Sequence, residues 1–241
     1  LELQDSAQLV FIDHRGCGRS KKTRAKDYTL ENNIEDIEAL RKHLGLEKII
    51  VLGTSYGGMV AQGYATRYPQ HVEKLILVVT APSYRFLDEA KAYLEEHGSA
   101  AQRNIAQHLW NGTFKNPAHV HEFLTLLEPL YSVKARAKKS PSHSNKPLTV
   151  WSHQALNNGF GDFLRTFDFI PKLKKIKCPT LILAGDQDWI SRPSQSKIIA
   201  KHIRHAEFHL FKHCGHSMAI DAHEKYIKTI RRFLKRNQPN H

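Results

Sequence analysis

Residues 51–59 read VLGTSYGGM and place one serine between glycines, directly after an apolar run. Gly53 to Gly57 fit the pattern G-x-S-x-G, and the small residues that follow predict a helix over 55–68. A buried strand, a tight glycine turn and a helix form the setting of a nucleophile elbow, in which the serine hydroxyl stands clear of the sheet. The stretch therefore predicts that Ser55 is a nucleophile in a parallel α/β fold.

A serine hydroxyl becomes a strong nucleophile beside a base, which a carboxylate orients in turn. Behind such an elbow the acid comes next in the chain and the histidine last, each after a strand. Asp186 and Asp188 follow one predicted strand, and His213 and His216 follow another. We favour Asp188, which lies farther from its strand, and His216, which follows Gly215 where the loop can turn sharply. Asp186, which suits a turn-stabilising role, and His213 remain the alternatives.

The same loop raises the question of a metal site, because it contains His213, Cys214 and His216. Ligands so close together cannot complete a tetrahedral site without a distant partner, and no Cys, His or acidic cluster elsewhere supplies one. We therefore predict no metal and no organic cofactor.

The order of predicted elements indicates a mostly parallel sheet flanked by helices, interrupted by a helical insertion. We expect a core from residues 1–80 and 171–241 and a cap, or lid, from residues 81–170. The predicted strands are 9–12, 48–52, 74–80, 179–185 and 206–211; the predicted helices are 29–44, 55–68, 87–96, 101–109, 119–127, 193–202 and 222–235. Residues 134–148, which are polar and basic, predict an exposed loop.

The composition is that of an ordinary globular chain of 241 residues, with a net charge of +13. Its basic residues lie in scattered clusters without interleaved aromatics or a nucleic-acid motif, so we predict no nucleic-acid partner. No apolar run is long enough to span a membrane and no signal peptide is visible, so we predict no membrane partner. The three widely spaced cysteines form no disulfide framework, which favours the cytoplasm.

Several motifs resemble those of the proline iminopeptidase group of α/β-hydrolases. Residues 13–20, DHRGCGRS, resemble that group's D-x-R-G-x-G-x-S segment; residues 53–69 resemble its elbow and first helix; residues 185–190, GDQDWI, resemble its acid loop. Gly215 and His216 resemble its histidine loop. The resemblance implies an α/β-hydrolase fold and an enzyme that releases N-terminal proline from short peptides.

The resemblance also implies roles for individual residues. Ser55, Asp188 and His216 would form the catalytic triad, and the Tyr56 N–H would bind the oxyanion. The alternatives are a carboxylesterase or other small-molecule hydrolase with the same triad, and a non-catalytic binding protein on a hydrolase scaffold. In every case we expect a small-molecule or short-peptide ligand.

Two family features have no evident counterpart here. The second oxyanion donor comes from a His-Gly loop that precedes the D-x-R-G segment, whereas the one His-Gly pair in this chain, residues 97–98, lies in the insertion. We therefore expect the first strands of the fold to be missing from this chain. Acidic cap residues would bind the substrate amine, but no motif singles one out among the candidates Glu95, Glu96, Glu122, Glu128 and Asp162.

Overall fold

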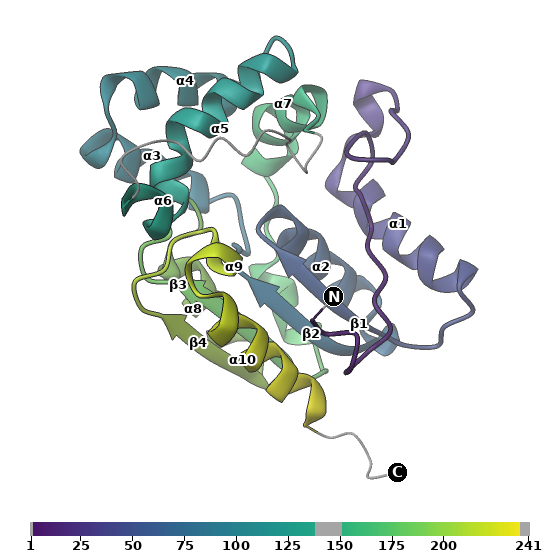
Figure 1. The fold of residues 1–241 in the computed structure, drawn as a ribbon. Coiled ribbons are helices and arrows are strands. Elements are labelled where there is room, and N and C mark those ends of the chain that lie inside the picture. Colours follow the sequence, from purple (N-terminus) through teal and green to yellow (C-terminus); the bar gives the residue numbers. More distant parts are fainter. Residues whose placement is uncertain (1, 138–150, 237–241) are drawn as a thin grey trace.

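The computed structural model describes residues 2–137 and 151–236, and a parallel sheet forms its centre (Figure 1). Four strands pair in the order β1-β2-β3-β4, each parallel to its neighbour. Their bounds are β1 Ile49–Thr54, β2 Val72–Val78, β3 Thr180–Gly185 and β4 Ala206–Phe211. Because all four run the same way, the loops after their carboxyl ends meet at one edge of the sheet, where ligands bind in open α/β folds.

The described residues contain ten α-helices and four short 3₁₀ turns. The α-helices are α1 Leu30–His43, α2 Tyr56–Arg67, α3 Phe86–His97, α4 Ala100–Asn111, α5 Pro117–Tyr131, α6 Val133–Ala137, α7 His153–Gly161, α8 Pro193–His202, α9 Met218–Asp221 and α10 His223–Lys235. The 3₁₀ turns are η1 Ala25–Asp27, η2 Pro69–His71, η3 Phe163–Arg165 and η4 Ile170–Lys175. Helix α1 begins as predicted, since the Thr29 hydroxyl accepts a hydrogen bond from the Asn32 N–H at 3.1 Å.

The buried side chains of β2 alternate between the two faces of the sheet, as the strand period requires. Leu75 and Leu77 belong to the larger apolar cluster, together with α2, α8 and the helices between β2 and β3. Ile76 and Val78 belong to a second cluster, which contains the apolar face of α10. Both faces of this strand are thus covered, and its continuous apolar sequence follows from that.

The chain between β2 and β3 forms helices α3 to α7, which gather together at one end of the sheet (Figure 1). The predicted helices 87–96, 101–109 and 119–127 are confirmed as α3, α4 and α5. Helix α7 was not predicted; the Ser152 hydroxyl caps it by accepting from the Ala155 N–H. That this region acts as a lid remains a prediction.

One sequence prediction about elements is wrong, and a second is wrong in the part that the structure describes. Residues 9–12 form no strand: Val10, Phe11 and Ile12 are 51%, 70% and 41% exposed, and no β-ladder includes them within the described residues. An apolar run becomes a strand only where another strand provides ladder partners, and apolarity alone does not specify one. The predicted loop 134–148 starts as helix α6, whose last residue is Ala137, and continues outside the described residues.

Candidate active site

Ser55 lies in a tight turn between β1 and α2, with backbone angles φ 54° and ψ −122° that are unusual for a residue with a side chain. The turn is held by its neighbours: the Ser55 N–H donates to the Val78 carbonyl at 2.9 Å, and the Thr80 hydroxyl donates to the Ser55 carbonyl at 2.7 Å. Gly53 is needed because a Cβ atom there would lie 2.2 Å from the Gly57 carbonyl oxygen. The predicted elbow geometry is present.

The structure brings Ser55, His216 and Asp188 together in one line of hydrogen bonds. His216 Nε2 lies 2.9 Å from Ser55 Oγ, and His216 Nδ1 lies 2.8 Å from Asp188 Oδ2. The two distances fit an imidazole that donates from Nδ1 to the carboxylate and accepts from the serine hydroxyl at Nε2. This tautomer is the one that general-base chemistry at Ser55 requires.

Asp188 is completely buried, and its second oxygen is also bonded. The Asp188 Oδ1 atom accepts from the backbone N–H groups of Ile190 and Ser191, both at 3.0 Å. These bonds fix the orientation of the carboxylate from behind, so that Oδ2 points at the imidazole. A buried charge needs such partners, because its desolvation is otherwise very costly.

The alternative residues lie elsewhere in the same loops. Asp186 accepts from the Cys214 N–H at 3.1 Å and so supports the backbone of the histidine loop rather than the imidazole. His213 is exposed, with φ 54°. Among the described residues no three His, Cys, Asp or Glu side chains gather as metal ligands would.

An aromatic residue that sequence reasoning missed, Tyr131, contacts the imidazole and is itself in contact with a second one, Trp189. The Tyr131 ring meets His216 edge to face at 5.4 Å, and it meets Trp189 in the same way at 5.4 Å. Burial raises the pKa of Tyr131, so its phenol stays neutral. Tyr131 comes from the end of α5 and no spacing motif marks it, whereas Trp189 directly follows the predicted acid.

Tyr56, the predicted oxyanion donor, is the first residue of α2. Its N–H is one of the groups that a first helical turn leaves without an internal partner. Its phenol oxygen accepts from Asn33 Nδ2 at 2.7 Å, and its ring meets that of His14 at 5.2 Å. Burial lowers the pKa of His14, with Asp36 and Asp13 opposing the shift, so a neutral imidazole covers the tyrosine.

The D-x-R-G segment forms a compact turn beside this tyrosine. Arg15 binds both oxygens of Asp36 on α1, at 2.6 and 2.8 Å. Asp13 accepts from the Arg19 N–H at 3.0 Å, and a Cβ atom on Gly18 would lie 2.4 Å from the Asp13 carboxylate. The motif residues thus hold the loop that carries His14.

Comparison with known proteins agrees with this geometry. The family model described as the alpha/beta hydrolase fold matches residues 2–222. The chain is 35% identical to the proline iminopeptidase PfmaB of Pestalotiopsis fici, over 97% of this chain and 84% of that one. The chain is an α/β-hydrolase of the proline iminopeptidase group.

Two more distant proteins agree with the α/β-hydrolase fold. The proline iminopeptidase of Saccharolobus solfataricus is 29% identical, over 94% of this hydrolase and 75% of that protein. A solved α/β-fold family hydrolase from Bacillus anthracis superposes with a TM-score of 0.75 at 21% identity, covering 92% of this chain and 80% of that one. The predicted fold class and hydrolase class are confirmed.

The acidic cap residues considered for the substrate amine are mostly exposed in this hydrolase. Glu95, Glu96, Glu122 and Asp162 are exposed, and Glu128 is half-buried. Glu95 faces Arg103 at 3.7 Å and Glu96 faces His97 at 3.7 Å. In the described residues none of the five forms a hydrogen bond with a side chain of the candidate site.

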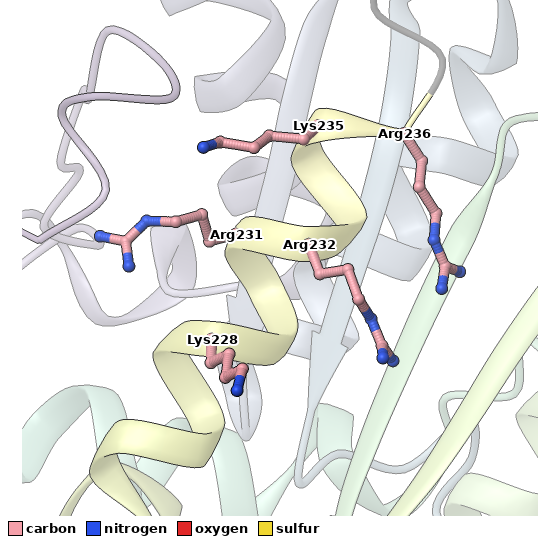
Figure 2. Close-up of a pocket in the computed structure, with 5 residues that line it drawn as sticks. All are labelled: Lys228, Arg231, Arg232, Lys235 and Arg236. Carbon is pink, nitrogen blue, oxygen red and sulfur yellow. The ribbon is translucent and has the colours of Figure 1, made fainter.

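A basic hollow lies elsewhere on the molecule, on the C-terminal part of α10 (Figure 2). Arg231 faces Asp5 at 3.3 Å, and Arg232 faces Glu207 at 3.6 Å. The side chains fan out to the two sides of the helix instead of converging on one point, so we assign no ligand to them. The hollow is lined by Lys228, Arg231, Arg232, Lys235 and Arg236.

No helix in the described residues is long and apolar enough to cross a membrane.

Proposed function

We propose that this hydrolase is a serine aminopeptidase that releases N-terminal proline from short peptides. The observation that carries the proposal is the line of hydrogen bonds from Asp188 through His216 to Ser55, which ends at a serine on a strained elbow. The names of its curated relatives supply the substrate class. The hydrogen bonds alone would leave the substrate open, and the names of the relatives alone would leave the catalytic residues open.

The geometry supports a two-step acyl transfer. Ser55 Oγ attacks the scissile carbonyl carbon while His216 Nε2 takes the hydroxyl proton, and Asp188 stabilises the imidazolium that forms. The Tyr56 N–H binds the negative oxygen of the tetrahedral intermediate. His216 then returns the proton to the leaving amine, and a water molecule hydrolyses the acyl-enzyme with the same base.

Residues 81–170 serve as the lid over this site in the proposed enzyme. Tyr131 at the end of α5 already contacts His216, so the lid contributes directly to the wall around the imidazole. A wall of this kind excludes water and limits the length of peptide that fits.

The test compares proline p-nitroanilide, its N-acetylated form and p-nitrophenyl butyrate. We expect turnover of the free-amine anilide, little of the acetylated one, and loss of turnover in Ser55→Ala. Hydrolysis of the butyrate ester alone would make the protein a carboxylesterase. Failure to hydrolyse any of the three, together with no labelling by a fluorophosphonate, would favour the non-catalytic binding protein.

A further inference from the structure

The loop that carries His216 is fastened to the junction between α5 and α6. The Asp221 carboxylate accepts from the Gly215 N–H at 2.8 Å on the loop side. On the cap side it accepts from the Ser132 hydroxyl at 2.6 Å and from the backbone N–H groups of Val133 and Lys134 at 3.0 and 3.1 Å. One side chain thus joins the residue before His216 to the start of α6.

A second bond joins the same two segments on the other side of His216. The Ser217 N–H donates to the Tyr131 carbonyl at 2.8 Å. The segments lie so close that a Cβ atom on Gly215 would be 2.6 Å from the same carbonyl oxygen. Both neighbours of His216 are therefore bonded, directly or through Asp221, to residues 131–134.

The donor set around Asp221 suits an ionised carboxylate, which offers about four acceptor sites. Burial by itself would raise the pKa of Asp221, but the hydrogen bonds from Ser132 and from the Gly215, Lys134 and Val133 N–H groups hold it below the ordinary value. The carboxylate is consequently charged at neutral pH and binds all four donors at once.

We propose that Asp221 is a positioning residue, which sets the place of the His216 imidazole by tying its loop to the cap. The inference rests on the proposed function, because it gives His216 the role of base. Asp186 fastens the same loop from the sheet side, through the Cys214 N–H. Asp186 and Asp221 together hold the His216 imidazole within reach of Ser55. A displacement of a catalytic group by about 1 Å lowers the rate on the order of 100-fold.

The test is Asp221→Asn, in which one amide N–H₂ would face backbone donors. We expect kcat to fall about 10–100-fold while KM changes less than about twofold, because the substrate wall stays but the base moves. The matched control is Asp168→Asn, another half-buried aspartate that accepts a backbone N–H, from Ile170 at 2.9 Å, away from the loop. It should leave kcat unchanged. An unchanged kcat in Asp221→Asn at equal folded fraction would overturn the proposal.

The cap side is tested separately with Ser132→Ala, which removes a donor to Asp221 without touching the histidine loop. We expect a smaller fall in kcat, and in the double variant with Asp221→Asn a fall no larger than that of Asp221→Asn alone. If the two falls in kcat instead multiplied in the double variant, Ser132 and Asp221 would act independently, and the proposed coupling between them would be contradicted.

A readout that needs no turnover separates this inference from the proposed function. The proton on His216 Nδ1, bonded to Asp188, gives a downfield NMR signal that His216→Ala identifies by its loss. We expect Asp221→Asn to shift or broaden this signal and Asp168→Asn to leave it in place. An unmoved signal would refute the positioning role, whereas a moved signal in a protein that cleaves no proline anilide would refute only the aminopeptidase.

Discussion

Two hydrogen-bond networks in this hydrolase each join a carboxylate, a hydroxyl and a basic side chain, but a different group lies in the middle of each. In the first, His216 lies between an acid and a hydroxyl, with Asp188 at 2.8 Å and Ser55 at 2.9 Å. The group in the middle is an imidazole, which can accept a proton from one side while the carboxylate steadies it from the other.

In the second network the carboxylate occupies the middle. Glu38 of α1 accepts from Arg41 Nε and Nη2 at 2.9 and 2.7 Å and from the Tyr64 hydroxyl at 2.9 Å. Glu38 is 3% exposed and Tyr64 is completely buried. Arginine never gives up its proton in proteins, and burial, followed by the hydrogen bond to Glu38, raises the pKa of Tyr64.

The comparison shows that the chemical nature of the basic group separates a network that can transfer a proton from one that can only support the fold. A network with a titratable base between acid and hydroxyl can pass a proton from the hydroxyl to the base while the acid stabilises the charged base. A network with a permanently charged arginine and a neutral phenol around a carboxylate can only hold α1 against α2. Each network should therefore fail in its own way when one member is changed.

The largest expected effect is that of Ser55→Ala. Turnover of the best substrate should fall by at least about 10⁴-fold, because the remaining groups have no nucleophile to activate. Thermal unfolding should stay close to that of the unchanged protein, since the side chain removed is a single hydroxyl. A variant that kept most of its activity would break the assignment of the first network.

Next in size is the difference between the two aspartates after β3. Asp188→Asn should lower kcat by about 10⁴-fold, because it favours the wrong imidazole tautomer. Asp186→Asn should cost much less, since it loses one bond to the Cys214 backbone. Steady-state kinetics of both variants decide the matter, and a more damaging Asp186→Asn would reverse our choice of acid.

The second network should respond in stability instead. Glu38→Gln leaves the buried Arg41 charge without its carboxylate and should lower the free energy of unfolding by about 3–5 kcal/mol. The matched control is Glu35→Gln on the same helix, whose partner Arg67 is partly exposed, and it should cost less than about 1 kcal/mol. Denaturant titration measures both, and kcat of the folded protein should remain the same. Equal losses would remove the distinction between a buried and an exposed pair.

The smallest effect is a pH dependence of that stability. The hydrogen bonds from Arg41, against the opposing effect of burial and with help from Tyr64, lower the pKa of Glu38 from 4.5 to about 2. Because the pKa is lower in the folded state, the ionised Glu38 carboxylate contributes fully to the free energy of unfolding above pH 4.5. This contribution disappears as the pH falls toward about 2. The stability gap between the unchanged protein and Glu38→Gln should narrow over that window. A stability difference that stays constant between pH 4.5 and about 2 would contradict the lowered pKa of Glu38.

The first network was predictable from sequence because each member follows a strand at a recognisable signal. The apolar run and glycines mark Ser55, and the loops after β3 and β4 carry the acid and the histidine. Choosing Asp188 over Asp186 needed more than local pattern, since the two are separated by one residue. Asp188 is buried against the imidazole and Asp186 binds the Cys214 backbone because of the way the two loops pack together. Sequence spacing does not determine that packing.

The second network was invisible in the sequence for a physical reason. Glu38 and Arg41 are three residues apart on a helix, a spacing that usually marks an exposed pair. Tyr64, 26 residues away, covers them only when α2 packs on α1. Asp221 was missed similarly, because its four donors come from residues 132–134 and from Gly215.

The central claim is that Ser55 is a nucleophile activated by His216. The most direct measurement treats the folded protein and the variants Ser55→Ala and His216→Ala with a fluorophosphonate and follows the adduct by peptide mass mapping. We predict rapid labelling on Ser55 alone, none in Ser55→Ala, and a rate at least about 100-fold lower in His216→Ala. Labelling of another residue, or an unchanged rate in His216→Ala, would contradict the account.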